Sequence, residues 1–136
     1  MKISTKGRYA LRMMLDIAER DTGEFIAIKE ISERQGISVK YLEQIVTSLT
    51  RAGLLRSGRG PQGGYTLTKR PEQYTAGEIL RAIEGKLAPV ACLEGEINPC
   101  ERSSICKTLH FWKGLNNVIN EYVDSVTLQD LIEAKI

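Results

Sequence analysis

A glycine-rich stretch near the middle of the chain constrains the fold more than any other feature. Two short β-compatible runs, Leu54-Leu55 and Tyr65 to Thr68, flank a segment that holds four of the twelve glycines, one proline and two arginines. Such a segment between two such runs predicts a tight β-hairpin. A helix–turn–helix pattern lies directly before it. The combination predicts a winged-helix domain that reads DNA, with the hairpin as its wing.

Three helices are expected before the hairpin. The spacing of apolar residues predicts a first helix from Tyr9 to Arg20 and a short second helix that ends at Gly36. Ser38 has the side chain of an N-cap for a third helix, which runs to about Ala52. The third helix is expected to turn four apolar residues to the core: Leu42, Ile45, Val46 and Leu49.

The pattern changes after residue 71. We therefore expect a winged helix–turn–helix DNA-binding domain over residues 1–71 and a second region over residues 72–136, which holds a loop and dimerisation helices. In the second region, Thr75 to Glu78 resembles a capping box, in which both side chains cap the start of a helix that ends at Gly85.

A loop and a long helix are expected next. Residues 86–105 show no sustained periodicity, and a loop of this length in a small protein is usually functional or disordered. A long helix is predicted from about Cys106 to Val123, and Thr127 to Asp130 resembles the cap of a short last helix. Because few elements remain for the long helix to pack on, a dimer seam is favoured over a core position. Its apolar stripe consists of Leu109, Trp112, Leu115, Ile119, Tyr122 and Val123. The predicted fold class is mainly α with a small β-hairpin wing and a long C-terminal dimerisation helix.

The charge is distributed unevenly along the chain. The net charge is only +2, but residues 1–71 hold 13 Lys and Arg against 7 Asp and Glu, and residues 72–136 hold 6 against 10. A basic half is suited to binding phosphates, although a solvated basic surface has the same signature. No apolar run approaches the roughly 20 residues that span a bilayer, and no secretory signal is visible. We expect a cytoplasmic protein that does not enter a membrane.

Polar residues of the third helix are candidates for contacts with DNA. With its apolar face in the core, the helix presents Lys40, Tyr41, Gln44, Thr47, Ser48 and Arg51. Lys40, Tyr41 and Gln44 lie in the N-terminal part, which usually contacts base edges. Glu43 can accept a hydrogen bond from cytosine and disfavours wrong sites. Arg59, at the tip of the hairpin, is suited to a narrow minor groove.

The three cysteines are candidates for metal ligands. Cys92, Cys100 and Cys106 are spaced C-x7-C-x5-C, and His110, the only histidine, follows four residues after the last. If a helix has already begun at Cys106, then Cys106 and His110 lie one turn apart on one face. Three thiolates and an imidazole can hold zinc or an iron–sulfur cluster. The alternative is three unrelated thiols and a surface histidine.

The chain resembles the IscR-type winged-helix transcription regulators, whose relatives include NsrR and CymR. The resemblance covers nearly the whole chain and rests on five sequence segments: residues 1–10 (MKISTKGRYA), 41–44 (YLEQ), 59–65 (RGPQGGY), 75–78 (TAGE), and the cysteine triad ahead of Trp112. It implies a homodimer with paired winged-helix domains, linked by the long helix, and a cluster-binding loop beside that helix.

The branches of this family differ in their cofactor. IscR-like members ligate a [2Fe–2S] cluster with three cysteines and one histidine. NsrR-like members hold a nitric-oxide-sensitive [4Fe–4S] cluster with a different fourth ligand, and CymR-like members control cysteine metabolism without the triad. Here the first cysteine interval is two residues longer than in typical IscR-like members, and the histidine falls one place later, where Leu109 occupies the usual ligand position.

Taken with this resemblance, the residues predict a DNA-binding regulator that senses iron–sulfur status through a [2Fe–2S] cluster on Cys92, Cys100, Cys106 and His110. The resemblance implies genes for iron–sulfur assembly as the targets, and a pseudo-palindromic operator is expected for a twofold dimer. The alternatives are a nitric-oxide or redox sensor with a [4Fe–4S] cluster, a zinc-stabilised regulator, and a cluster-free regulator of cysteine metabolism. An enzyme is not expected, because the sequence has no evident nucleophile–base pair and no phosphate loop.

Overall fold

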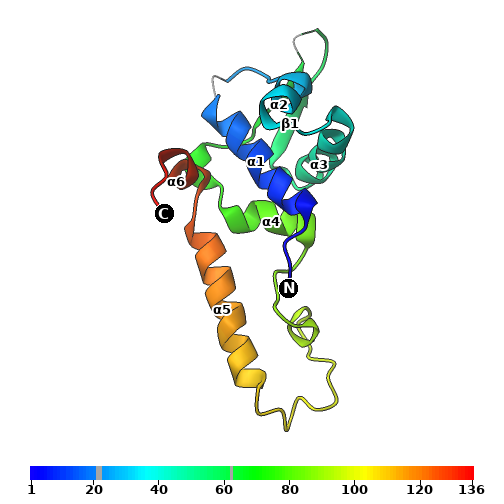
Figure 1. Ribbon diagram of the computed structural model, residues 1–136, viewed down its shortest axis with the longest axis vertical. Helices are drawn as coiled ribbons and strands as arrows, with labels where there is room; N and C mark the ends of the chain where they lie inside the picture. The colour runs from blue at the N-terminus through cyan, green and yellow to red at the C-terminus, as the bar shows by residue number, and fades with distance from the viewer. Residues whose placement is uncertain (21–22, 62) are drawn as a thin grey trace.

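A computed structural model describes residues 1–20, 23–61 and 63–136 of the chain (Figure 1). These residues form six α-helices, two short 3-10 turns and one two-stranded antiparallel hairpin, which confirms the predicted fold class. The elements in chain order are α1 (Thr5–Glu19), α2 (Ile28–Gln35), α3 (Val39–Arg51), β1 (Leu55–Gly58), β2 (Gly64–Leu67), η1 (Pro71–Gln73), α4 (Ala76–Glu84), η2 (Ala91–Leu93), α5 (Leu109–Ser125) and α6 (Leu128–Glu133).

The ends of the first three helices follow from capping residues. The Ser38 hydroxyl accepts from the backbone N–H of Tyr41 at 3.2 Å, and Gly36 adopts the left-handed conformation with φ 65°, as predicted. Helix α1 begins four residues earlier than predicted because the Ser4 hydroxyl caps it, accepting from the Gly7 N–H at 3.0 Å. These caps satisfy backbone donors that would otherwise lack a partner.

The hairpin is the predicted wing, and it is held at its base by a third segment. Strands β1 and β2 pair in register from Leu55 opposite Leu67 to Gly58 opposite Gly64. Ile26 exchanges two backbone hydrogen bonds of 2.9 Å with Tyr65, which fixes the wing to the segment before α2. Gly64, with φ 150°, allows this approach, since a Cβ there would lie 2.2 Å from the Ile26 carbonyl oxygen.

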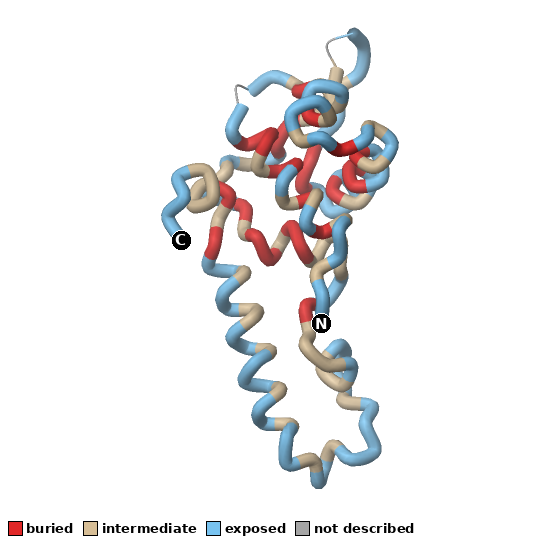
Figure 2. Tube along the Cα trace, viewed as in Figure 1, coloured by how far each residue is buried: buried red, intermediate tan, exposed pale blue. Residues whose placement is uncertain are grey.

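The hydrophobic core lies between α1, α3, α4 and α6 and includes residues from both halves of the sequence (Figure 2). Leu128 of α6 and Ile79 of α4 are fully buried with residues of α1 and α3. Tyr74 is also fully buried, and its hydroxyl donates to the Leu54 carbonyl at 2.8 Å and accepts from the Thr68 N–H at 2.8 Å. Tyr74 therefore connects the base of the wing to the start of α4. The division into domains at residue 71 stays a prediction.

Helix α5 forms an arm that extends away from this core, and residues 86–108 run beside it from α4 to its free end (Figure 1). We call residues 86–108 the cysteine segment. No residue of α5 is buried. The chain returns to the core through Val126, whose carbonyl accepts from the Ala76 N–H at 2.8 Å.

Two of the predicted caps in this half have different outcomes. The predicted cap at Thr127 is confirmed as a full capping box with Asp130. At α4, Thr75 accepts from the Glu78 N–H at 3.0 Å as predicted, but the Glu78 carboxylate pairs with Lys69 at 2.8 Å instead of capping the helix. The expected capping box is therefore only half formed, because a cation from beyond the hairpin competes for the carboxylate.

Candidate nucleic-acid interface and metal centre

Helix α3 is oriented by its four predicted core residues, all of which are buried: Leu42, Ile45, Val46 and Leu49. The opposite side carries Lys40, Gln44, Thr47 and Arg51, which are exposed and recur at the spacing of one helical face. We call these four residues the reading face. Glu43 is exposed at its margin, and its backbone carbonyl accepts from the Thr47 hydroxyl at 2.9 Å. The face offers two cations and two neutral hydrogen-bonding groups, which are the side chains that contact phosphates and base edges.

Two predicted contact residues of α3 are less open than expected. Tyr41 is half-buried and packs edge to face on Tyr9 of α1, with 5.5 Å between the ring centroids. Ser48 is half-buried, and its hydroxyl accepts from the ammonium of Lys6 at 3.2 Å. Helix α1 therefore lies along one edge of the reading face, a contact that the apolar pattern of either helix does not reveal.

The wing carries its arginines in different settings. Arg59 is exposed beside the tip, as predicted. The guanidinium of Arg56 lies 5.8 Å from the centre of the Phe25 ring, which also packs under Gly58. Both arginines are exposed, but only Arg56 is described in contact with an aromatic ring.

A buried carboxylate fixes α1 against α2. Asp16 is 1% exposed, and it accepts from the Arg34 guanidinium at 2.7 Å and from the Gln35 amide at 2.8 Å. Burial raises the pKa of Asp16, but the hydrogen bonds from Arg34 and Gln35 and the charges of Arg34 and Arg20 outweigh burial, so the pKa is lowered overall. No local sequence pattern predicts this cluster, because Arg34 and Gln35 are eighteen and nineteen positions from Asp16.

The structure places the four candidate metal ligands along the cysteine segment and the start of α5. Cys92 lies in η2 and is half-buried, Cys100 is exposed, and Cys106 is half-buried. His110 is exposed in the first turn of α5. Across the described residues, no three His, Cys, Asp or Glu side chains are gathered closely enough to hold a metal ion.

Helix α5 begins at Leu109 and does not include Cys106. Cys106 and His110 therefore do not lie one turn apart on the same helix. The expectation of a helix from Cys106 was wrong: Cys106 precedes a turn at residues 107–108, and its carbonyl accepts from the Leu109 N–H at 3.4 Å. Hydrogen bonds from the side chain and backbone of Thr108 lower the pKa of the Cys106 thiol, and its sulfur lies 3.3 Å from the Thr108 hydroxyl. A lowered pKa favours the thiolate, the form that binds metals.

One polar cluster joins the core, the arm and the cysteine segment. Arg81 of α4 donates to both carboxylate oxygens of Asp124, at 2.6 and 3.0 Å, and to the side chain of Asn120 at 2.7 Å. Asn120 in turn donates to the Leu87 carbonyl at 3.2 Å. We call these four residues the α4–α5 joint. The helices come close here because position 77 is glycine, where a Cβ would lie 2.2 Å from Asp124 Oδ1.

The α4–α5 joint also changes the pKa of its carboxylate, that of Asp124. The hydrogen bond from Arg81, followed by its positive charge, lowers the pKa of Asp124. Asp124 is therefore ionised at neutral pH, and the pair is a charge-assisted, bidentate contact.

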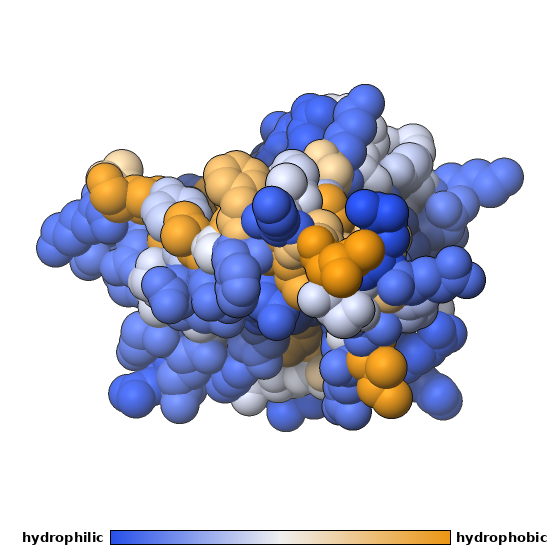
Figure 3. Space-filling model, turned by 90° about the horizontal axis from the view of Figure 1, so that it is seen from below, coloured by the Kyte–Doolittle hydropathy of each residue, from blue (hydrophilic) through white to orange (hydrophobic). Residues whose placement is uncertain are grey.

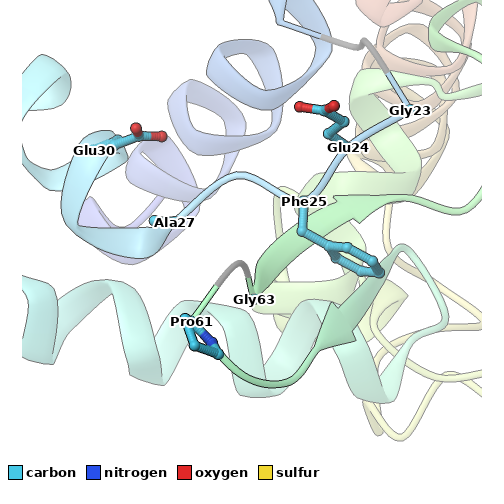
Figure 4. Close-up of a pocket in the computed structure, with 7 residues that line it drawn as sticks. All are labelled: Gly23, Glu24, Phe25, Ala27, Glu30, Pro61 and Gly63. Carbon is cyan, nitrogen blue, oxygen red and sulfur yellow. The ribbon is translucent and has the colours of Figure 1, made fainter.

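A cleft of about 580 Å³ lies between the segment before α2 and the wing (Figure 4). Glu24 and Glu30 line one side, and Pro61 and Gly63 of the wing line the other. The cleft contains neither a histidine nor a cysteine among its described lining residues, and it is remote in sequence from the cysteine segment. Its two carboxylates repel anionic ligands, so we do not expect the cleft to bind the phosphates of DNA.

Comparison with known proteins identifies the family. A family model described as "Rrf2: Iron-dependent Transcriptional regulator" matches residues 3–134. The chain belongs to the Rrf2 family. Rrf2 proteins are transcriptional regulators rather than enzymes, so this chain is a DNA-binding transcriptional regulator, as its helix–turn–helix and wing predicted.

Relatives within the Rrf2 family carry different names. The HTH-type transcriptional regulator CymR of Bacillus subtilis is 41% identical over 131 residues, which cover 96% of this chain and 89% of that protein. The HTH-type transcriptional regulator IscR of Aliivibrio salmonicida is 37% identical over 132 residues, 97% of this chain and 77% of that protein. The resemblance to this group inferred from the sequence is confirmed.

Solved structures agree with this assignment. The structure of B. subtilis CymR, described as the global cysteine regulator, matches with a TM-score of 0.81 and 36% identity over 100% of this chain and 99% of that chain. The structure of T. potens IscR matches with a TM-score of 0.77 and 36% identity over 100% and 92%. In the part of the chain that is described, no helix combines the length and the apolar character required to cross a membrane.

Proposed function

We propose that this Rrf2 regulator is a homodimer that senses iron–sulfur status through a [2Fe–2S] cluster held by Cys92, Cys100, Cys106 and His110. The observation that carries the proposal is the position of all three free cysteines on one segment that is hydrogen-bonded to the α4–α5 joint. The expected targets are genes for iron–sulfur cluster assembly.

The donor set has the right chemistry for such a cluster. Three thiols and an imidazole supply the sulfur and nitrogen ligands of iron–sulfur and zinc sites, and the Cys106 thiol already has a lowered pKa. The bound cluster would supply a centre whose presence or redox state changes with iron supply. Because the thiols are not gathered, binding requires the cysteine segment to close around the group, and metal binding is then coupled to ordering of the segment.

The α4–α5 joint is the proposed route from the cysteine segment to the DNA reader. The Leu87 carbonyl is held by Asn120, and Asn120 and Asp124 are held by Arg81, which lies on α4 in the core. Helix α4 packs on both α1 and α3. A movement of the segment therefore reaches the reading face through two packed helices, without a contact between the cysteines and DNA.

The proposed dimer uses the outer face of α5. Four apolar side chains of α5 are exposed, and their spacing places them on one stripe. They are Phe111 (64% exposed), Leu115 (36%), Val118 (63%) and Tyr122 (57%). Viewed from the end where α5 begins, apolar side chains are visible at the surface among hydrophilic ones (Figure 3). A second copy of the same helix offers a stripe that matches this one, so we assign it as the partner. The stripe expected from the sequence shares only Leu115 and Tyr122 with this outer face; its remaining members are half-buried.

On DNA, such a dimer would place two reading faces on the half-sites of a pseudo-palindromic operator. We assign base and phosphate contacts to Lys40, Tyr41, Gln44 and Arg51, discrimination against wrong bases to Glu43, and a minor-groove contact to Arg59. The exposure of the reading face, of Glu43 and of Arg59 supports these assignments, and Tyr41, which is half-buried, is assigned from its place in the N-terminal part of α3.

A cluster-free regulator is the second candidate function. The match to B. subtilis CymR, with 41% sequence identity and a TM-score of 0.81, favours it, because that protein is described as a cysteine regulator. The cysteine triad favours the cluster instead.

Metal and sulfide analysis separates the two candidates. Protein purified without oxygen is expected to be coloured and to contain iron and acid-labile sulfide. The Cys100→Ala variant should lose both, whereas Ser104→Ala, a control in the same segment, should keep them. Colourless protein, or protein with stoichiometric zinc and no iron, would overturn the cluster assignment and leave the DNA-binding function standing.

A further inference from the structure

Helix α1 runs along one edge of the reading face. Lys6 contacts Ser48, and Tyr9 contacts Tyr41, so residues that ascend in α1 meet residues that descend in α3. The two helices are therefore antiparallel along this edge. Tyr41 and Ser48 lie seven residues apart, on one side of α3, roughly a quarter turn from the reading face.

The environment of Lys6 is uncommon for a lysine. It is half-buried, and its ammonium donates to a neutral hydroxyl rather than to a carboxylate. Lys6 takes no part in any ion pair found among the described residues. An ammonium has three donors, so two N–H groups remain after the bond to Ser48. The neighbouring side chains thus orient a positive charge at the border of the DNA-reading surface without neutralising it.

We propose that Lys6 binds a phosphate of the DNA backbone beside the major groove, which makes α1 a third DNA-contacting element together with α3 and the wing. The inference builds on the reading face proposed above and adds a contact that is independent of base sequence. A lysine that lies beside a recognition helix and lacks a carboxylate partner suits a phosphate, which it binds as a point charge. The hydrogen bond to Ser48 holds the ammonium at the edge of α3, so docking the reading face brings it to the backbone.

The test measures affinity against salt concentration. The probes are a duplex selected from a random-sequence pool and a scrambled duplex of the same length, titrated by fluorescence anisotropy. Lys6→Gln should weaken binding to both duplexes by a similar factor and reduce the slope of log affinity against log salt by about one per protomer. Lys6→Arg should retain the slope, because the charge is kept.

Two controls separate a phosphate contact from other roles. Arg8→Gln removes an exposed cation from the same helix, but Arg8 has no described hydrogen bond or ion pair with α3, so the salt slope should not change. Ser48→Ala removes the partner of Lys6 while keeping its charge, and should retain most of the slope. Thermal unfolding verifies that each variant is folded, and Lys6→Met, which keeps the aliphatic stem, replaces the glutamine variant if that variant unfolds.

An unchanged slope in folded Lys6→Gln and Lys6→Met would overturn the inference. An equal reduction of the salt slope in Arg8→Gln would also overturn it, because that result indicates a general charge effect. So would a full reduction of the slope in Ser48→Ala, which indicates that Lys6 has a purely structural role. Absence of salt-dependent binding in the unaltered protein would instead refute the reading face itself.

Discussion

Replacing Arg81 by methionine should weaken the contact between α4 and α5 while leaving the core folded. The substitution keeps a long apolar stem but removes two hydrogen bonds to Asp124 and one to Asn120. The pair is about half exposed at Asp124 (48%) and one-third exposed at Arg81. Solvent therefore screens it, and we expect a coupling free energy of about 0.5–1 kcal/mol rather than that of a buried pair.

A double-mutant cycle with Asp124→Asn measures this coupling. The free energies of unfolding of the two single variants, the double variant and the unaltered protein are obtained from urea denaturation. If the joint transmits the state of the cysteine segment, about 1 kcal/mol of coupling limits its effect to roughly fivefold in DNA affinity. Arg81→Met should remove this contribution of up to fivefold from the difference in DNA affinity between cluster-loaded and cluster-free protein.

Gly77→Ala perturbs the same joint from the other side. Its Cβ would lie 2.2 Å from Asp124 Oδ1 and 2.9 Å from the Val123 side chain, so the Asp124 carboxylate must leave its position against Arg81 or α4 and α5 must move apart. Gly77→Ala should therefore also reduce the difference in DNA affinity between cluster-loaded and cluster-free protein. A coupling energy near zero in the cycle, together with an unchanged DNA response in both Arg81→Met and Gly77→Ala, would refute the role of the joint.

Two further predictions concern the DNA-reading half. Gly64→Ala should displace the wing, since its Cβ would lie 2.2 Å from the Ile26 carbonyl oxygen; weaker DNA binding with intact helices by circular dichroism is expected, and unchanged affinity would contradict the described anchor. Asp16→Asn should lower the free energy of unfolding by about 2 kcal/mol near neutral pH, because the buried carboxylate accepts from Arg34 and Gln35. The pKa of Asp16 is lower in the folded protein than in the unfolded chain. Asp16 therefore stabilises the fold fully at pH values above its pKa in the unfolded chain, about 3.9, and this stabilisation is lost as the pH falls through its pKa in the folded protein. Urea midpoints measured from about pH 7 to 2 should therefore differ less between the two proteins at the acidic end, and a constant difference would contradict this account.

The sequence predicted most of the local structure of the DNA-reading half because that half is built from local signals. The Ser38 cap, the left-handed Gly36 and the glycines of the wing act over a few residues, and each is visible in the printed sequence. The arrangement of α1 against α3 was not predictable in this way. The contact between Lys6 and Ser48 spans forty-two residues and has no periodic signature.

The cysteine half was less predictable for two physical reasons. Helix α5 begins at Leu109 without a side-chain cap at Thr108, so the sequence has no start signal, and the apolar pattern extended the prediction to Cys106. The α4–α5 joint depends on charges far apart in the chain, since Arg81 and Asp124 are forty-three positions apart. The metal ligands stay a prediction, because their assembly requires the bound group as well as the fold.

The most direct test of the account compares the DNA affinity of one preparation before and after its cluster is removed, under oxygen-free conditions and on one selected duplex. We expect the DNA affinity to change on removal of the cluster, reconstitution with iron and sulfide to restore it, and Cys100→Ala to show the cluster-free value throughout. Equal affinity in all three states of the unaltered protein would contradict the claim that the cysteines control the DNA reader.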